Sequence, residues 1–253
     1  MNLLICNDDG IESEGLKTLA VRLSKKHNII VVAPFENRSA IGHAISIGKQ
    51  ITLVEHKFNN DIKAFSLSGT PADCVKFAIH YFKEFKIDAV VSGINIGSNL
   101  GTDIIYSGTL SAALEGVYFG YPAFAVSSTA KKNNNFEACA QYAEEILEAV
   151  LLKDKSPVAY NINVPNISNI KGIKLTKLGI LQYEVIYTKV GENSYVLSGD
   201  AIEHDKNDVD CDVEYNKKGY VTVTPVLFNK SDYFTLENMK RMQITTADGK
   251  VIN

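Results

Sequence analysis

The sequence is poor in arginine. Its three arginines are Arg22, Arg38 and Arg241, and the formal net charge of the chain is −3 at pH 7. A groove that binds nucleic acid needs clustered positive charge, so we expect no nucleic-acid groove. The same scarcity leaves the chain without an arginine cluster that could bind phosphate on its own.

Long apolar runs are also missing. None approaches the roughly 18 residues that a helix needs to cross a bilayer. The N-terminus enters an apolar segment directly, without the basic flank and the small-residue cleavage site of a secretory leader. We therefore expect a cytoplasmic protein with no membrane partner.

Cysteines are few and far apart, at Cys6, Cys74, Cys139 and Cys211. Most have apolar neighbours, which is typical of reduced thiols in a core rather than of disulfides or a zinc site. The sixth residue after each is never arginine, so none begins the loop of a thiolate phosphatase.

The residues that are present predict an α/β protein. Of 253 residues, 45% are hydrophobic, which is enough for a large core. An apolar run at 3–6 is followed by a helical pattern at 13–26 and a second apolar run at 29–33, which Pro34 closes. Strand, helix and strand in this order imply a right-handed crossover and parallel pairing. We predict a Rossmann-like, doubly wound and mostly parallel sheet.

The later pattern continues this alternation and then changes. Thr70, Pro71 and Asp73 are predicted to cap and begin a helix. Further strands are expected at 88–92, 122–127 and 158–163, and further helices at 110–117 and 136–151. We predict a catalytic core over residues 1–171, including a β excursion at 41–67. Residues 172–253 are expected to form a β-rich extension with a short helix at 235–242.

Two adjacent carboxylates, Asp8 and Asp9, follow the first predicted strand, in the sequence Asn7-Asp8-Asp9-Gly10. Ligands of open α/β sheets bind outside the carboxyl ends of the strands, so these groups are placed for chemistry. The alternative is that they only form a turn with Gly10 and cap the next helix. This stretch alone does not decide between the two.

A glycine-rich segment at 93–109 follows a predicted strand and leads into a helix that begins near Ser107, Gly108 and Thr109. Glycines let backbone N–H groups approach a ligand, and a helix N-terminus offers free N–H groups to an anion. The segment is neither a P-loop nor a dinucleotide fingerprint. An unusually long connection is the alternative, but such connections in compact domains are usually functional, so a phosphate cradle is favoured.

Three strand ends of the predicted sheet bring Asp8 and Asp9 together with Ser39 and Asn95. Taken alone, the segment around Ser39 reads as a polar surface loop. Together these side chains offer only oxygen donors, which suit Mg²⁺, Mn²⁺ or Ca²⁺ rather than Zn²⁺ or copper. A divalent ion beside a phosphate cradle predicts hydrolysis of a phosphate ester without a covalent intermediate.

An acidic stretch over 198–215 could suggest a second metal site, but no ligand spacing stands out. We expect it to be a solvated loop.

Several segments resemble, in order, the signature segments of the SurE family of stationary-phase survival proteins. These segments are Asn7-Asp8-Asp9-Gly10, Asn37-Arg38-Ser39, Gly69-Thr70-Pro71-Ala72-Asp73-Cys74, Val91-Ser92-Gly93-Ile94-Asn95, Asn99-Leu100-Gly101, Tyr106-Ser107-Gly108-Thr109, Asn163-Val164-Pro165 and Gly219-Tyr220-Val221-Thr222-Val223-Thr224-Pro225. The match spans nearly the whole chain. Departures are Ala40, where the family often has glycine, and Thr102, where it commonly has an acid.

The resemblance implies a metal-dependent nucleoside monophosphate phosphatase. Asp8, Asp9, Ser39 and Asn95 would ligate one divalent cation per subunit, with Mg²⁺ or Mn²⁺ preferred. Asn99, Ser107, Gly108 and Thr109 would face the phosphate. The C-terminal extension would be exchanged between the subunits of a dimer or tetramer.

We therefore expect hydrolysis of nucleoside 5′-monophosphates, with 3′-monophosphates as a second candidate class. The expected catalytic residues are Asp8, Asp9, Asn99 and Ser107, and either aspartate is a candidate general base. An aspartyl-phosphate phosphatase is the first alternative, but it usually has a second aspartate where Gly10 stands. A Mg²⁺-binding signalling receiver is the second, but it needs a phosphorylatable aspartate where Ser92-Gly93-Ile94-Asn95 ends the third strand.

Overall fold

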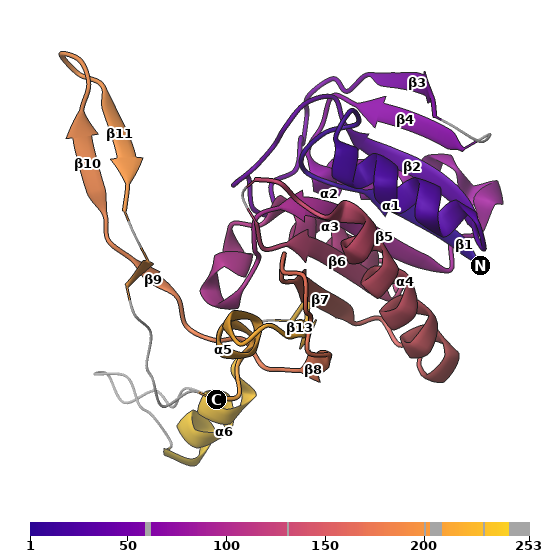
Figure 1. Ribbon diagram of the computed structural model, residues 1–253. Helices are drawn as coiled ribbons and strands as arrows, with labels where there is room; N and C mark the ends of the chain where they lie inside the picture. Colours follow the sequence, from indigo (N-terminus) through magenta and orange to yellow (C-terminus); the bar gives the residue numbers. More distant parts are fainter. Residues whose placement is uncertain (59–61, 131, 200, 203–208, 230, 243–253) are drawn as a thin grey trace.

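A computed structural model describes residues 1–58, 62–130, 132–199, 201–202, 209–229 and 231–242. Its centre is a nine-stranded sheet with the strand order β3-β4-β2-β1-β5-β6-β7-β13-β8 (Figure 1). In that order the strands are Leu53–Lys57, Lys63–Leu67, Asn28–Pro34, Asn2–Cys6, Ala89–Ile96, Ala123–Ser128, Ala159–Val164, Val221–Val226 and Ile173–Leu175. β3 is antiparallel to β4 and β13 is antiparallel to β7, whereas the other neighbours are parallel. The predicted mostly parallel α/β fold is confirmed.

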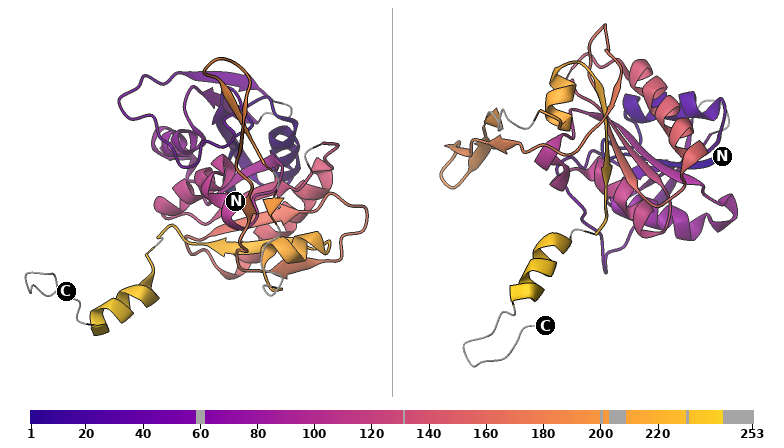
Figure 2. Two further views of the ribbon diagram at one scale, coloured as in Figure 1. Left: turned by 90° about the vertical axis from the view of Figure 1, so that its left-hand side faces the viewer. Right: turned by 90° about the horizontal axis from the view of Figure 1, so that it is seen from below.

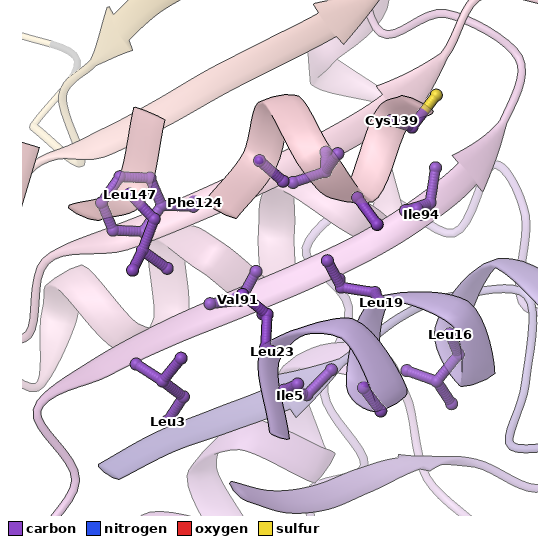
Figure 3. Close-up of a cluster of buried hydrophobic side chains, with 14 of the residues drawn as sticks. Leu3, Ile5, Leu16, Leu19, Leu23, Val91, Ile94, Phe124, Cys139 and Leu147 are labelled. Carbon is purple, nitrogen blue, oxygen red and sulfur yellow. The ribbon is translucent and has the colours of Figure 1, made fainter. Parts of the chain in front are cut away.

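Helices cover both faces of this sheet, as the doubly wound prediction requires. α1 (Glu14–Ser24) and α4 (Phe136–Lys153) bury their apolar side chains in one core cluster. In Figure 3, Leu16, Leu19 and Leu23 of α1 point toward Ile5 and Val91 of the sheet. α2 (Pro71–Tyr81) and α3 (Gly108–Tyr118) close the second cluster on the opposite face. The central strands β1 and β5 are therefore buried on both sides, which fits their continuous apolar sequences.

Local sequence explains where these helices begin. Ser13 caps α1 by accepting a hydrogen bond from the backbone N–H of Leu16. Thr70 and Asp73 form a capping box at the start of α2, with Pro71 at its first position, as predicted. All four cysteines are buried and none is in a disulfide with another of the four, so the predicted core thiols are confirmed.

The chain beyond residue 171 returns to the sheet. β8 and β13 form its last two strands, so the sheet continues past the boundary predicted between core and extension. β13 pairs with β7 from Thr222 to Val226, and both strands are buried at nearly every position. Two short helical turns, η1 (Lys83–Phe85) and η2 (Gly101–Ile105), and the helix α5 (Asp212–Lys217) complete this body.

An arm and a helix project from the body (Figures 1 and 2). The arm contains the hairpin of β10 (Ile186–Lys189) and β11 (Tyr195–Ser198), and the pair formed by β9 (Gln182–Tyr183) and β12 (Ala201–Ile202) at its base. α6 (Tyr233–Met242) follows β13 and has no buried residue. The described helices include none that is long and apolar enough to span a bilayer. Residues 59–61, within the predicted β excursion, lie outside the described residues.

Candidate active site

The carboxyl ends of β1, β2 and β5 meet at one edge of the sheet because these three strands are parallel neighbours. Asp8 and Asp9 follow β1, Ser39 follows β2, and Asn95 lies at the end of β5. The backbone N–H of Arg38 donates to the carbonyl oxygen of Asp8 at 2.7 Å, which holds the first two loops together. A cavity of about 270 Å³ opens here, and Asp8, Ser39, Asn95, Asn99 and Ser107 are among the residues that line it.

Asp8 is buried, with only 3% of the residue exposed. Its Oδ1 accepts a hydrogen bond of 2.6 Å from the hydroxyl of Thr109. Burial raises the pKa of Asp8 to about 6, and the neighbouring charge of Asp9 adds to this, although the Thr109 hydrogen bond opposes it. An ionised Asp8 is therefore costly without a cation nearby.

Asp9 is more accessible and is held at both carboxylate oxygens. Its Oδ1 accepts from the side-chain amide of Asn37 at 3.1 Å, and its Oδ2 accepts from the backbone N–H of Ile96 at 3.3 Å. Burial raises the pKa of this carboxyl as well. Asp9 thus connects the loop after β2 to the end of β5, so both loops depend on it.

Ser39 and Asn95 are oriented by local bonds that leave their oxygens available. The side chain of Asn37 accepts from the backbone N–H of Ser39 at 2.8 Å, so the Ser39 hydroxyl is not used in that turn. The amide nitrogen of Asn95 donates to the carbonyl of Gly97 at 2.8 Å. This bond occupies the nitrogen, and the amide oxygen is the atom that remains for a ligand.

α3 begins directly against Asp8. The helix starts at Gly108, within the predicted start at 107–109, and the Ser107 hydroxyl caps it by accepting from the N–H of Leu110 at 3.0 Å. A Cβ atom at Gly108 would lie 2.7 Å from the Asp8 Cβ and 2.8 Å from its Oδ2, so only glycine permits this approach. The positive end of the α3 dipole and its free N–H groups therefore face the carboxylate edge.

The structure gives the four predicted phosphate residues different surroundings. Asn99 and Ser107 line the cavity, whereas Gly108 and Thr109 are not among the residues that line it. The Thr109 hydroxyl is engaged with Asp8. Their roles toward a phosphate group remain predictions.

Asn99 is fixed by two residues that the sequence reasoning missed, Asn161 and Asn163 of β7. The backbone N–H of Asn99 donates to Asn163 Oδ1 at 2.8 Å, and its carbonyl accepts from both asparagine side chains at 2.7 and 3.0 Å. Asn161 and Asn163 are both fully buried. Two amides at alternate positions of a strand expected to be buried were the signal, because buried amides need partners.

Asp212 is a third structurally important residue that the sequence analysis did not single out. It belongs to the acidic stretch expected to be a solvated loop, and for Asp212 that expectation is wrong, since none of its surface is exposed. Its carboxylate accepts backbone N–H groups from Gly101, Gly179 and Val213 at 2.8 to 2.9 Å, which explains how an acid can be buried there. Residues 200 and 203–208 of the same stretch lie outside the described residues.

The outer end of the cavity is formed by Asp103, Tyr106 and Tyr183. The hydroxyl of Tyr183, from the base of the arm, donates to Asp103 Oδ2 at 2.6 Å. The described residues that line the cavity include no lysine or arginine, and no ion pair between described residues involves Asp8, Asp9 or Asp103.

This charge balance fits a bound divalent cation. Partly buried carboxylates without a basic partner are stabilised by a metal ion, and carboxylate, hydroxyl and amide oxygens suit a hard ion. Over the described part of the chain, no group of three or more histidine, cysteine, aspartate or glutamate side chains could hold a metal. The candidate set contains two carboxylates, Asp8 and Asp9, and its other donors are Ser39 and Asn95.

Comparison with known proteins agrees with this geometry. The family model described as survival protein SurE matches residues 3–185. The chain belongs to the SurE family. A 5′-nucleotidase SurE of Clostridium botulinum strain Eklund 17B is 43% identical over 250 residues, 96% of this chain and 99% of that protein. Another 5′-nucleotidase SurE, of Pseudothermotoga lettingae, is 42% identical over 89% of this chain and 88% of that one. The crystal structure of the SurE protein from Aquifex aeolicus superposes with a TM-score of 0.80 at 32% identity, covering 96% of this chain and all of that one.

The two departures from the SurE pattern have clear surroundings. Ala40 has a φ of 58°, the left-handed region that favours glycine, so the loop beside Ser39 keeps a glycine-like conformation without a glycine. Thr102 exchanges two hydrogen bonds with the backbone of Leu181, since its hydroxyl donates to the carbonyl and accepts from the N–H. In this SurE protein, Thr102 therefore anchors the arm.

Proposed function

We propose that this SurE family member is a divalent-metal-dependent phosphomonoesterase that hydrolyses nucleoside 5′-monophosphates, and also 3′-monophosphates, to nucleoside and phosphate. The observation that carries this proposal is the contact between Asp8 and the N-terminus of α3, in a cavity whose described lining residues include no lysine or arginine. Relatives named 5′-nucleotidase SurE, at 42 to 43% identity, support the same activity.

The metal would be held by Asp8, Asp9, Ser39 and Asn95, and Mg²⁺ or Mn²⁺ suits this oxygen set. When bound there, the ion polarises a phosphoryl oxygen and lowers the pKa of a water molecule. These four residues reach the same sheet edge from the ends of three strands, β1, β2 and β5. The loops are tied to one another by the bonds of Arg38 and Ile96 to the two aspartates.

The chain's own groups bind and orient the substrate. The N–H groups at the start of α3, with Ser107 and Asn99, face the phosphate oxygens, where developing negative charge is stabilised by the helix dipole. Thr109 orients Asp8 through its hydroxyl. One of the two carboxylates, Asp8 or Asp9, accepts the proton of the attacking water.

Phosphate release from adenosine or guanosine 5′-monophosphate is the direct test. We expect turnover with added Mg²⁺ or Mn²⁺, and we expect EDTA to abolish it because the carboxylate edge then lacks its cation. Restoring the ion in excess should restore the rate. Absence of turnover of any nucleotide with any divalent ion would contradict the proposal.

Acid-quench trapping with labelled phosphate separates the two phosphatase mechanisms. Direct attack by water leaves no label on the protein. A phosphorylated aspartate would favour the aspartyl-phosphate alternative, although Gly10, with a φ of 96°, stands where that class has its second aspartate.

We also infer self-association, as a dimer or tetramer, through the C-terminal extension. The apolar side chains of α6 are 43 to 78% exposed, and they are Tyr233, Phe234, Leu236, Met239 and Met242. Val185 and Tyr187 of the arm are exposed to a similar degree. Exposed apolar side chains gathered on projecting segments are typical of association sites.

A chain that ends after Asn229 tests this inference. It lacks α6 but keeps β13 and Asp212, and we expect analytical ultracentrifugation at micromolar concentration to show a smaller species than the full chain with unchanged far-UV circular dichroism. Truncation near residue 171 is a poorer test, because it removes two strands of the sheet. A full-length chain that sediments as a monomer would contradict the inference.

A further inference from the structure

Two segments that lie far apart in the sequence are joined in register at the outer end of the cavity. Gly101 and Gly179 share the carboxylate of Asp212. The next pair is Thr102 and Leu181, which exchange side-chain and backbone hydrogen bonds. The third is Asp103 and Tyr183, joined by the 2.6 Å bond from the tyrosine hydroxyl. Alternate residues of the segment before the arm thus contact successive residues of η2.

This arrangement fixes the position of one aromatic ring. Tyr183 also pairs with Ala201 across the β9 and β12 strands, so both its backbone and its hydroxyl are held. Burial and the bond to Asp103 raise the pKa of Tyr183 to about 12, so the hydroxyl stays a donor at neutral pH. Even so, 44% of Tyr183 is exposed, and the residue lines the cavity that also contains Asp8 and Ser107.

The chemistry of this end differs from that of the phosphate end. Its one charged group, Asp103, is negative, so a second phosphate or a carboxylate of the substrate would be repelled there. The other side chains that line the cavity include two exposed apolar ones, Tyr106, which is 63% exposed, and Ile96, which is 47% exposed. A neutral planar group suits such a surface, because the flat face of any nucleobase can stack on an aromatic ring.

We propose that Tyr183 is a specificity-determining residue, whose ring takes the nucleobase of the substrate, and that Asp103 is the positioning residue that holds this ring. The inference rests on the proposed phosphomonoesterase function and names the part of the substrate that the arm recognises. It makes the leaving group a nucleoside rather than any alcohol. The arm is then part of the substrate site.

The experiment compares adenosine 5′-monophosphate with ribose 5-phosphate, which lacks only the base, under Mn²⁺. Tyr183→Ala is expected to lower kcat/KM for the nucleotide by about 5- to 100-fold, mainly through KM, because one stacking contact is lost. The same variant should change kcat/KM for ribose 5-phosphate by less than about twofold. Tyr183→Phe keeps the stacking ring but lacks the hydroxyl that Asp103 holds, so its kcat/KM for the nucleotide should fall by less than that of Tyr183→Ala but below that of the unaltered chain, with ribose 5-phosphate again unchanged.

A matched control is Tyr81→Ala, which removes an exposed ring at the C-terminal end of α2, outside the arm and outside the set of residues that line the cavity. It should leave both substrates unchanged. An equal loss on both substrates in Tyr183→Ala would show a merely structural role and overturn the inference, while leaving the proposed function intact.

Equilibrium binding of adenosine, measured by calorimetry, keeps the inference testable without turnover. Weaker binding by Tyr183→Ala than by the unaltered chain supports the ring's role even if neither phosphate ester is hydrolysed, in which case the proposed function alone fails. Equal binding by the two proteins overturns the inference.

Discussion

Replacing Asp9 with asparagine is expected to lower kcat/KM for nucleoside monophosphates by about 10³-fold, on the scale of losing one preorganised charge from a transition-state site. Asparagine keeps the size of the side chain and can still accept the N–H of Ile96, so the end of β5 should stay in place. What it removes is one of the two negative charges that would hold the cation.

The measurement should include a readout besides turnover. Manganese binding, followed by electron paramagnetic resonance, is expected to weaken in Asp9→Asn, while urea denaturation should give a midpoint close to that of the unaltered chain. Asp154→Asn is the matched control, since Asp154 is exposed at the end of α4. A fully active Asp9→Asn protein would reject the site assignment.

Gly108→Ala is expected to lower kcat/KM by about 10²-fold, the scale of a misplacement of roughly 1 Å at a reacting centre. The added methyl group would lie 2.7 Å from the Asp8 Cβ, so either Asp8 or the start of α3 must move. Both are parts of the proposed site. The buried Thr109 hydroxyl, which binds Asp8, would move with the helix.

Stability should change in the direction opposite to helix propensity. Alanine in place of glycine favours a helix by about 0.5 to 1 kcal/mol, whereas overpacking costs about 1 to 3 kcal/mol, so we expect a net loss in the free energy of unfolding. Gly191→Ala is the control, because a Cβ there meets only the Ser194 side chain at 3.3 Å. An active and more stable Gly108→Ala protein would show that α3 does not need this approach to Asp8.

The parts of the molecule that depend on neighbouring residues could be predicted from the sequence. The cap formed by Thr70, Pro71 and Asp73 is such a case, since the two hydrogen bonds of its capping box join residues that are three apart in the sequence. The meeting of Asp8, Ser39 and Asn95 in one cavity was also predictable, because parallel strands that are consecutive in a sheet present their carboxyl ends at one edge.

The parts that depend on distant residues could not be predicted. Asp212 binds a backbone group 111 residues away, and no local pattern distinguishes it from the acidic residues around it. Tyr183 enters the site only because the segment before the arm pairs with η2. The insertion of β13 between β7 and β8 is similarly non-local. The alternation of apolar and polar residues in β13 predicts a strand, but it does not predict which strands are its neighbours.

The place of β13 in the sheet also affects how the chain is made on the ribosome. β7 is synthesised roughly 60 residues before β13, and at typical rates of translation this interval lasts about 3 to 12 seconds. Throughout it, the outer edge of β7 lacks the partner that it has in the finished protein, and such an edge is open to pairing with another chain. The nascent protein therefore still presents an unpaired strand edge late in its synthesis, after most of its core has already been made.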